Sequence, residues 1–158
     1  MSERKPINRH KALQPFSRDH HHGLLLSWKI RKGLLLGVEP KRIKRYTDWF
    51  YSNYLIPHFA AEEEHIFPIL GSDHELIKKC LTEHRRLSRL FEDPNEILRN
   101  LSRIEEELER HIRFEERVVF QEIQAIATQE QVEVIESAHE ALYFEEDNTD
   151  PFWQEELD

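Results

Sequence analysis

Residues that break helices are few in this chain, and they divide it into long uninterrupted stretches. Its 158 residues include only 4 glycines and 7 prolines, and no stretch alternates strongly between apolar and polar side chains as a β-strand does. The main breaks lie at 37–40, 71–73 and 93–94. The length suits one domain with a single hydrophobic core. The chain is therefore predicted to be all-α, with four long helices.

Start and stop signals give approximate bounds for these helices. The predicted helices run from about Ser17 to Leu36, from about Lys41 to Ile66 or slightly beyond with a kink at Pro57, from about Asp73 to Phe91, and from Asp93 or Ser102 to about Ile126. The last helix has two candidate starts because both positions open a sequence that resembles a capping box. A shorter amphipathic helix is predicted over 129–143.

Short connections between long helices predict antiparallel neighbours. We therefore expect an up-down-up-down four-helix bundle with a short additional C-terminal helix. In this interpretation residues 1–15 are an N-terminal arm, 16–128 form the helical domain, and 129–158 hold the short helix and an acidic tail. The tail is expected to be loose, although Phe152 and Trp153 could dock on the domain.

The bulk composition argues against several classes of partner. A formal net charge of −9 disfavours nucleic acid, which binds clustered basic surfaces. No segment approaches the roughly 18 consecutive apolar residues of a membrane span, and the first ten residues do not resemble a signal peptide. Cys80 is the only cysteine, which suits a reducing compartment. We expect a cytoplasmic protein, either a monomer or a homodimer.

A ten-residue motif occurs twice and suggests chemistry. His58-Phe-Ala-Ala-Glu62-Glu-Glu-His-Ile-Phe and His111-Ile-Arg-Phe-Glu115-Glu-Arg-Val-Val-Phe both read His-x-x-x-Glu-Glu-x-x-(Ile/Val)-Phe. Residues i and i+4 share one helix face, so each histidine and glutamate could hold one metal centre together. The bare spacing would equally fit an exposed pair. Apolar neighbours on the same face favour burial, and a buried glutamate is costly unless it is paired or bound to a metal.

The other two long helices offer matching histidines. His84 lies on an apolar stripe with Cys80 and Leu87. Among His20, His21 and His22, the apolar residues at +3, +4 and +7 make His21 the first choice for the inward position, and His20 is the second. A helix rises about 1.5 Å per residue, so counting residues from each turn tests whether these groups are level. The histidines and glutamates lie at about the same level in the bundle, provided that the fourth helix starts near Ser102.

These residues resemble the hemerythrin-like, HHE cation-binding family over about residues 16–126. The family pattern is one histidine on the first helix, His-x-x-x-Glu on the second, one histidine on the third and His-x-x-x-Glu on the fourth. The matching residues are His21 or His20, His58, Glu62, His84, His111 and Glu115. The resemblance implies a centre of two non-haem iron ions bridged by both glutamates. Zinc or another divalent metal is an alternative, because histidine and glutamate also bind zinc.

The chain departs from the oxygen-carrying members at Ser88, where those proteins have a further histidine. The residue set is more similar to members with four histidines and two glutamates, such as iron–sulfur repair proteins and an iron- and oxygen-sensing domain. The chain lacks the cysteine-bearing N-terminal segment of the repair proteins. The leading hypothesis is a protein that binds iron and binds, senses or handles O₂, NO or peroxide. The alternatives are a redox enzyme acting on peroxide or NO, and an interaction module with a structural or degenerate metal site.

Overall fold

The structure is a computed structural model, and it describes residues 9–138 and 144–155. Within these residues every regular element is helical and there is no strand, so the predicted all-α class is confirmed. In chain order the elements are η1 (Lys11–Leu13), α1 (Gln14–Leu35), α2 (Pro40–Phe50), η2 (Tyr51–Leu55), α3 (Ile56–Ala61), η3 (Glu62–Ile66), η4 (Phe67–Ile69), α4 (Glu75–Glu92), α5 (Ile97–Phe114), η5 (Glu115–Val119), α6 (Phe120–Ile126) and α7 (Gln129–Ala138).

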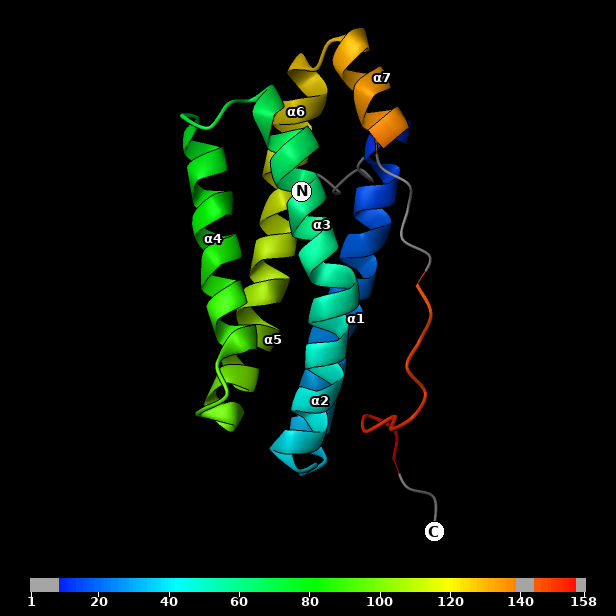
Figure 1. The fold of residues 1–158 in the computed structure, drawn as a ribbon, viewed down its shortest axis with the longest axis vertical. Helices are drawn as coiled ribbons and strands as arrows, with labels where there is room; N and C mark the ends of the chain where they lie inside the picture. The colour runs from blue at the N-terminus through cyan, green and yellow to red at the C-terminus, as the bar shows by residue number, and fades with distance from the viewer. Residues whose placement is uncertain (1–8, 139–143, 156–158) are drawn as a thin grey trace, which may run out of the picture.

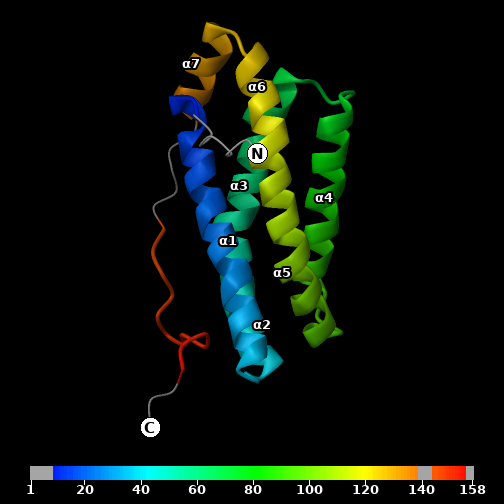
Figure 2. The ribbon, with the colours of Figure 1, turned by 180° about the vertical axis from the view of Figure 1, so that it is seen from behind.

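Several elements join end to end, so the described residues contain four long helical stretches. The elements from α2 to η4 run without a break over residues 40–69, and those from α5 to α6 over 97–126. Together with α1 and α4 these stretches lie side by side, and their connections fall at alternate ends of the molecule (Figures 1 and 2). Among the described residues, no helix combines the length and the apolar character that crossing a bilayer requires.

The connections follow the predicted breaks closely. Helix α1 ends at Leu35, and Gly37 then takes a left-handed φ of 74°, a conformation in which glycine has no side chain to clash. Pro40 opens α2 at its first position, where the missing N–H of proline has no helical partner to lose. Gly71 takes a φ of 94° in the next connection. Glycine and proline thus set two of the three turns.

The third turn matches neither candidate start of the fourth helix, Asp93 or Ser102. Helix α5 begins at Ile97, after Glu96 has turned the chain with a left-handed φ of 49°. The Asn100 side chain donates a hydrogen bond to the Asp93 carboxylate at 3.0 Å, so Asn100 lies beside the C-terminal end of α4. Residues on α4 and α5 that lie at the same height are therefore found by counting from Asn100 on α5, and not from its first helical residue.

Three segments within the long stretches are π-helical. One, Tyr51–Leu55, ends two residues before Pro57, where the missing N–H and the bulky ring disturb the ordinary helical ladder. The other two are Glu62–Ile66 and Glu115–Val119, which begin at the two glutamates of the repeated motif. Single-turn π segments inside α-helices are frequent at functional sites. The sequence repeat is thus also a repeat of local structure.

The apolar core consists of two separate clusters along the length of the molecule. One contains Leu26 and Ile104 and includes residues of α1, α2, α4 and α5. The other contains Phe16 and Phe120 and includes residues of α1, α4 and α6, as well as Ile135 of α7. Phe16 and Leu26 belong to different clusters on the same helix, so the core is interrupted between them. The buried polar residues described below occupy this interruption.

The acidic tail was expected to be loose, but its described part, residues 144–155, packs along α1 and α2 (Figures 1 and 2). Phe152 is only 2% exposed and belongs to the apolar cluster around Leu26. Asp150 pairs with Arg42 at 2.7 Å. The tail thus contributes an apolar side chain to the core, which its acidic composition does not suggest. The predicted helix over 129–143 is described as far as Ala138, and its remaining residues lie outside the described part of the chain.

Replacing Phe152→Ala tests whether the tail is part of the folded core. Removal of a fully buried aromatic ring is expected to lower the free energy of unfolding by about 3 kcal/mol. Urea denaturation followed by circular dichroism measures this change. Leu98→Ala is the control, because Leu98 is 58% exposed and its truncation should cost less than about 0.5 kcal/mol. Equal stability of the two variants would show that the tail does not contribute to the core.

Candidate metal centre

Four histidines, one from each long helical stretch, meet with two glutamates between the two apolar clusters. All six side chains are buried, and both glutamates are 0% exposed. They are His20 from α1, His58 from α3, Glu62 from η3, His84 from α4, His111 from α5 and Glu115 from η5. The structure therefore brings together all the predicted residues except His21.

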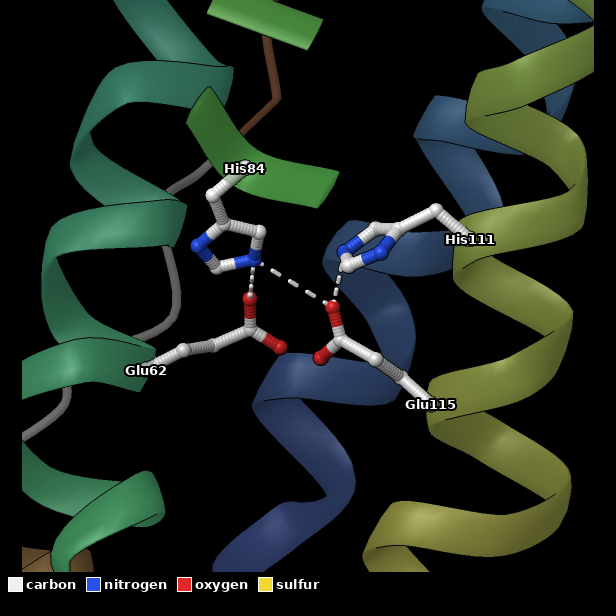
Figure 3. A group of neighbouring side chains, drawn as sticks. All are labelled: Glu62, His84, His111 and Glu115. Atoms are coloured by element: carbon white, nitrogen blue, oxygen red, sulfur yellow. Dashed lines mark hydrogen bonds and ion pairs between the residues drawn. The ribbon is translucent and has the colours of Figure 1, made fainter. Parts of the chain in front are cut away.

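Each histidine directs its Nε2 atom at a glutamate carboxylate (Figure 3 shows Glu62, His84, His111 and Glu115). The Nε2 atoms of His58 and His84 lie 3.3 and 3.2 Å from Oε1 of Glu62. His20 Nε2 lies 3.4 Å from the other oxygen of Glu62. His111 Nε2 contacts Oε1 of Glu115, which also lies 3.4 Å from His84 Nε2. The four imidazoles thus converge on two carboxylates.

The other nitrogen of each imidazole, Nδ1, is held by a second carboxylate further out. The outer pairs are His20 with Glu116 at 2.8 Å, His58 with Asp19 at 3.0 Å, His84 with Glu63 at 3.0 Å and His111 with Glu83 at 2.7 Å. An ionised carboxylate only accepts hydrogen bonds, so each Nδ1–H donates. A neutral imidazole in this position keeps its Nε2 lone pair for the centre of the cluster.

These outer carboxylates connect the four helical stretches in a closed ring. Asp19 on α1 holds the histidine of α3, Glu63 on η3 holds that of α4, Glu83 on α4 holds that of α5, and Glu116 on η5 holds that of α1. Each outer carboxylate is the sequence neighbour of an inner residue. One step along a helix turns a side chain by about 100°, so the neighbour of an inward group points sideways, at the adjacent helix.

Sequence reasoning missed the role of this outer ring. It assigned no hydrogen-bond partner to the outer nitrogens of the imidazoles, and the nearby tyrosines Tyr51 and Tyr54 do not fill that role. The Tyr51 hydroxyl instead donates to Glu92, and Tyr54 pairs with the backbone of Glu145. An available signal was the acidic residue directly beside each inner residue in sequence. The sequence of one helix does not show which residues of another helix it contacts. The acidic neighbours alone therefore could not be assigned as partners of the imidazoles.

The prediction that His21 faces inward is wrong. His21 is exposed, whereas His20 is 3% exposed and reaches the cluster. The apolar residues that favoured His21 are themselves poorly buried, with Leu25 37% and Trp28 47% exposed. The face of α1 that points inward instead carries Phe16, His20 and Gly23. Glycine has no apolar side chain, so a search for stripes of apolar residues does not mark this face as buried.

The carboxylates set the protonation of the histidines. Burial by itself lowers the pKa of His20, but the hydrogen bond with Glu116 and the carboxylates of Glu62 and Glu115 outweigh it and raise the pKa from 6.5 to about 10. Burial opposes the charged form at His84 too, yet its hydrogen bonds with glutamates hold its pKa well above 6.5. Burial would raise the pKa of Glu62, whereas the neighbouring His58 charge and the close contacts with Glu115, His20 and His58 hold it well below 4.5.

The cluster has more acceptor capacity than its protein partners use. Among the described residues, six buried side-chain atoms of the cluster lie within ion-pair distance of other cluster atoms but make no well-aligned hydrogen bond: His20 Nε2, His58 Nε2, His111 Nε2, both oxygens of Glu62 and Oε2 of Glu115. Buried polar atoms without partners are rare and costly. The inner and outer rings also place six carboxylates around four imidazoles. Arg9 pairs with one of these carboxylates, Glu116, at 2.8 Å, and protons on the imidazoles or metal cations can balance the others.

The donor atoms form two overlapping groups. His20, His58 and Glu62 offer ligand atoms within 4.8 Å of one another, and so do Glu62, His84, His111 and Glu115. Glu62 belongs to both groups. Each group could hold a metal ion.

An apolar cavity adjoins the cluster. His20, His58 and His111 line it together with Asp19, His22 and mostly apolar or aromatic side chains such as Leu55 and Ile112. The space open to the centre of a water-sized molecule is about 20 Å³, which is room for one or two very small molecules.

No protein-family model, curated protein or solved structure matches this chain. The resemblance to the hemerythrin-like family therefore stays a prediction from the residues.

The metal-free protein should lose stability as the pH rises. The raised pKa of His20 contributes stability that is fully present below its unfolded value of 6.5 and is lost as the pH rises through about 10. The depressed pKa of Glu62 acts in the opposite way, because its contribution is lost on acidification below 4.5. Urea unfolding of chelator-treated protein at pH 6.5, 8 and 9.5 measures the first effect. Stability that increases across this window would contradict the assignment of charges.

Proposed function

We propose that this protein is a hemerythrin-like, antiparallel up-down-up-down four-helix bundle that holds two non-haem iron ions and binds, senses or handles O₂, NO or peroxide. The observation that carries the proposal is the convergence of four histidine Nε2 atoms on the buried carboxylates of Glu62 and Glu115. A protein interior tolerates such carboxylates only beside positive charge.

The donor set favours two iron ions over one zinc ion. Structural zinc sites are almost always four-coordinate and use cysteine and histidine, whereas this cluster offers four imidazoles and two carboxylates, of which Glu62 belongs to both donor groups. Mixed imidazole and carboxylate donors inside a helix bundle suit iron. Zinc or another divalent metal remains the competing occupant, and elemental analysis of the purified protein distinguishes them.

The chain's own residues orient and insulate the centre. The outer carboxylates Asp19, Glu63, Glu83 and Glu116 fix the imidazole orientations and raise their basicity through the Nδ1 hydrogen bonds. Bound iron would supply an open coordination position and a change of oxidation state. The adjoining cavity is small and apolar, which supports a diatomic molecule over a large substrate.

A redox enzyme acting on peroxide or NO would use the same centre, so turnover by the iron-loaded protein separates it from a sensor or carrier. An interaction module would act through the acidic tail and the 129–143 helix. Asp147 and Asp150 of that tail pair with Arg45 and Arg42 of this same chain, which supports an intramolecular role for the tail.

Adjacent histidines on α1 provide a matched test of the proposed ligands. His20→Ala should lose at least half of the bound iron, because His20 supplies one of the four inward nitrogens. His21→Ala should keep it, since His21 is exposed. Metal content per chain and the near-ultraviolet charge-transfer absorption of the ferric protein give the readout. Equal iron content in the two variants, with both folded, would remove His20 from the site.

The outer ring predicts a graded effect on affinity. Glu83→Gln removes the anionic acceptor of the His111 Nδ1–H group and should weaken iron binding by about tenfold to a hundredfold. Glu106→Gln on α5 is the control, because Glu106 forms an exposed ion pair with Arg110. Competition with a chromophoric chelator measures both affinities. Identical affinities would show that the outer carboxylates do not tune the centre.

A further inference from the structure

The cavity beside the histidines extends from the buried cluster toward the surface. Its inner residues His20, His58 and His111 are all buried. At its other end lie His22, Tyr54 and Phe144, which are only half-buried. The cavity is therefore a short, mainly apolar path between solvent and the proposed metal centre, with one acidic side chain, Asp19, in its lining.

Phe144, the first described residue of the C-terminal tail, covers the outer end of this path. Its ring stacks on His22 with centroids 4.1 Å apart and planes 12° from parallel. It also contacts Tyr54, at a centroid distance of 4.9 Å. Both neighbours line the same cavity. Phe144 thus comes from a segment distant in sequence from the other lining residues, and it fills the gap between α1 and the stretch that contains Tyr54.

The residues that follow Phe144 hold it in place. The Glu145 backbone N–H donates to the Tyr54 hydroxyl at 3.0 Å. Glu146 accepts hydrogen bonds from Lys29 and from the Tyr46 hydroxyl. Further along, the buried ring of Phe152 anchors the segment in the apolar cluster. The position of Phe144 is therefore set by several independent contacts.

The opposite side of the cluster offers a less direct approach. A surface groove lined by Tyr51, Glu63, His84 and Arg89 reaches the outer edge of His84. There the ring of Phe59 stacks on the His84 ring, with centroids 3.8 Å apart, and the Nδ1–H of His84 donates a hydrogen bond to Glu63. A molecule in this groove would meet the outer face of one imidazole, whereas the cavity behind Phe144 adjoins three of the four.

We propose that Phe144 is a specificity-determining residue that closes the path to the metal centre and limits it to small uncharged molecules such as O₂ and NO. The inference rests on the proposed function for the identity of the ligand. The closure itself depends only on the cavity and on the contacts of Phe144. A phenyl ring over an apolar path excludes bulky molecules by size and charged ones by the cost of desolvation.

Xenon tests the closure without any metal. Chelator-treated, ¹⁵N-labelled full-length protein is placed under xenon pressure, and the amide shifts of Gly23, Leu55 and Ile112 report occupancy of the cavity. Phe144→Ala should bind xenon about tenfold more tightly than wild type, because an apolar cavity enlarged by a missing ring accepts xenon. Phe144→Leu is the matched control and should stay near wild type. Equal xenon affinity in all three proteins would overturn the proposal.

Two peroxides test selection by size in the iron-loaded protein. Hydrogen peroxide and tert-butyl hydroperoxide are mixed with the ferrous protein, and oxidation is followed by absorption in the near ultraviolet. Phe144→Ala should reduce the rate ratio between the small and the bulky oxidant about tenfold, a difference of about 1.4 kcal/mol in barrier. An unchanged ratio would contradict the role in specificity. If the chain took up no iron, the proposed function would fail while the xenon comparison still tested Phe144.

Discussion

Two glutamate carboxylates buried in the middle of a helical core need positive charge beside them, and the rest of the structure is arranged around that need. Glu62 and Glu115 are fully buried and begin the two π-helical segments of the molecule's internal repeat. Four imidazoles surround them. The apolar core divides into two clusters with these groups between them.

The ring of outer carboxylates explains how one helical stretch is positioned relative to the next. Each of the four Nδ1 hydrogen bonds joins neighbouring stretches, so the orientation of every imidazole depends on the placement of another helix. The charge of the ring also couples the site to pH. Without a metal the imidazoles retain protons, as the raised pKa of His20 indicates, and a bound cation has to displace those protons.

Much of this arrangement could be predicted from local sequence patterns. The motif spacing placed His58 and Glu62 on one helix face, and His111 and Glu115 on another, because that relation lies within a single helix. The choice of His21 over His20 was wrong because Leu25 and Trp28 are apolar but exposed. The start of α5 at Ile97 depended on a left-handed Glu96, which the sequence does not mark. Apolar side chains and glycine-poor stretches predict helices better than they predict which face is buried.

The outer ring and the docked tail could not be predicted in the same way, since both depend on contacts between distant segments. Asp19 and His58 are far apart in the chain, and so are Phe144 and His22. An acidic tail resembles a solvated one until its basic partners, such as Arg42, are placed beside it. These tertiary contacts hold the proposed ligands in position and cover the path to them.

The central claim is that Glu62 and Glu115 share two cations with the four histidines. Crystals of the iron-loaded protein, measured on both sides of the iron absorption edge, test it most directly. The account predicts two anomalous peaks between the two carboxylates, each beside imidazole Nε2 atoms. Crystals without anomalous density there, with the imidazoles bound directly to Glu62 and Glu115 through protons, would show that the cluster is a buried ion-pair network and not a metal centre.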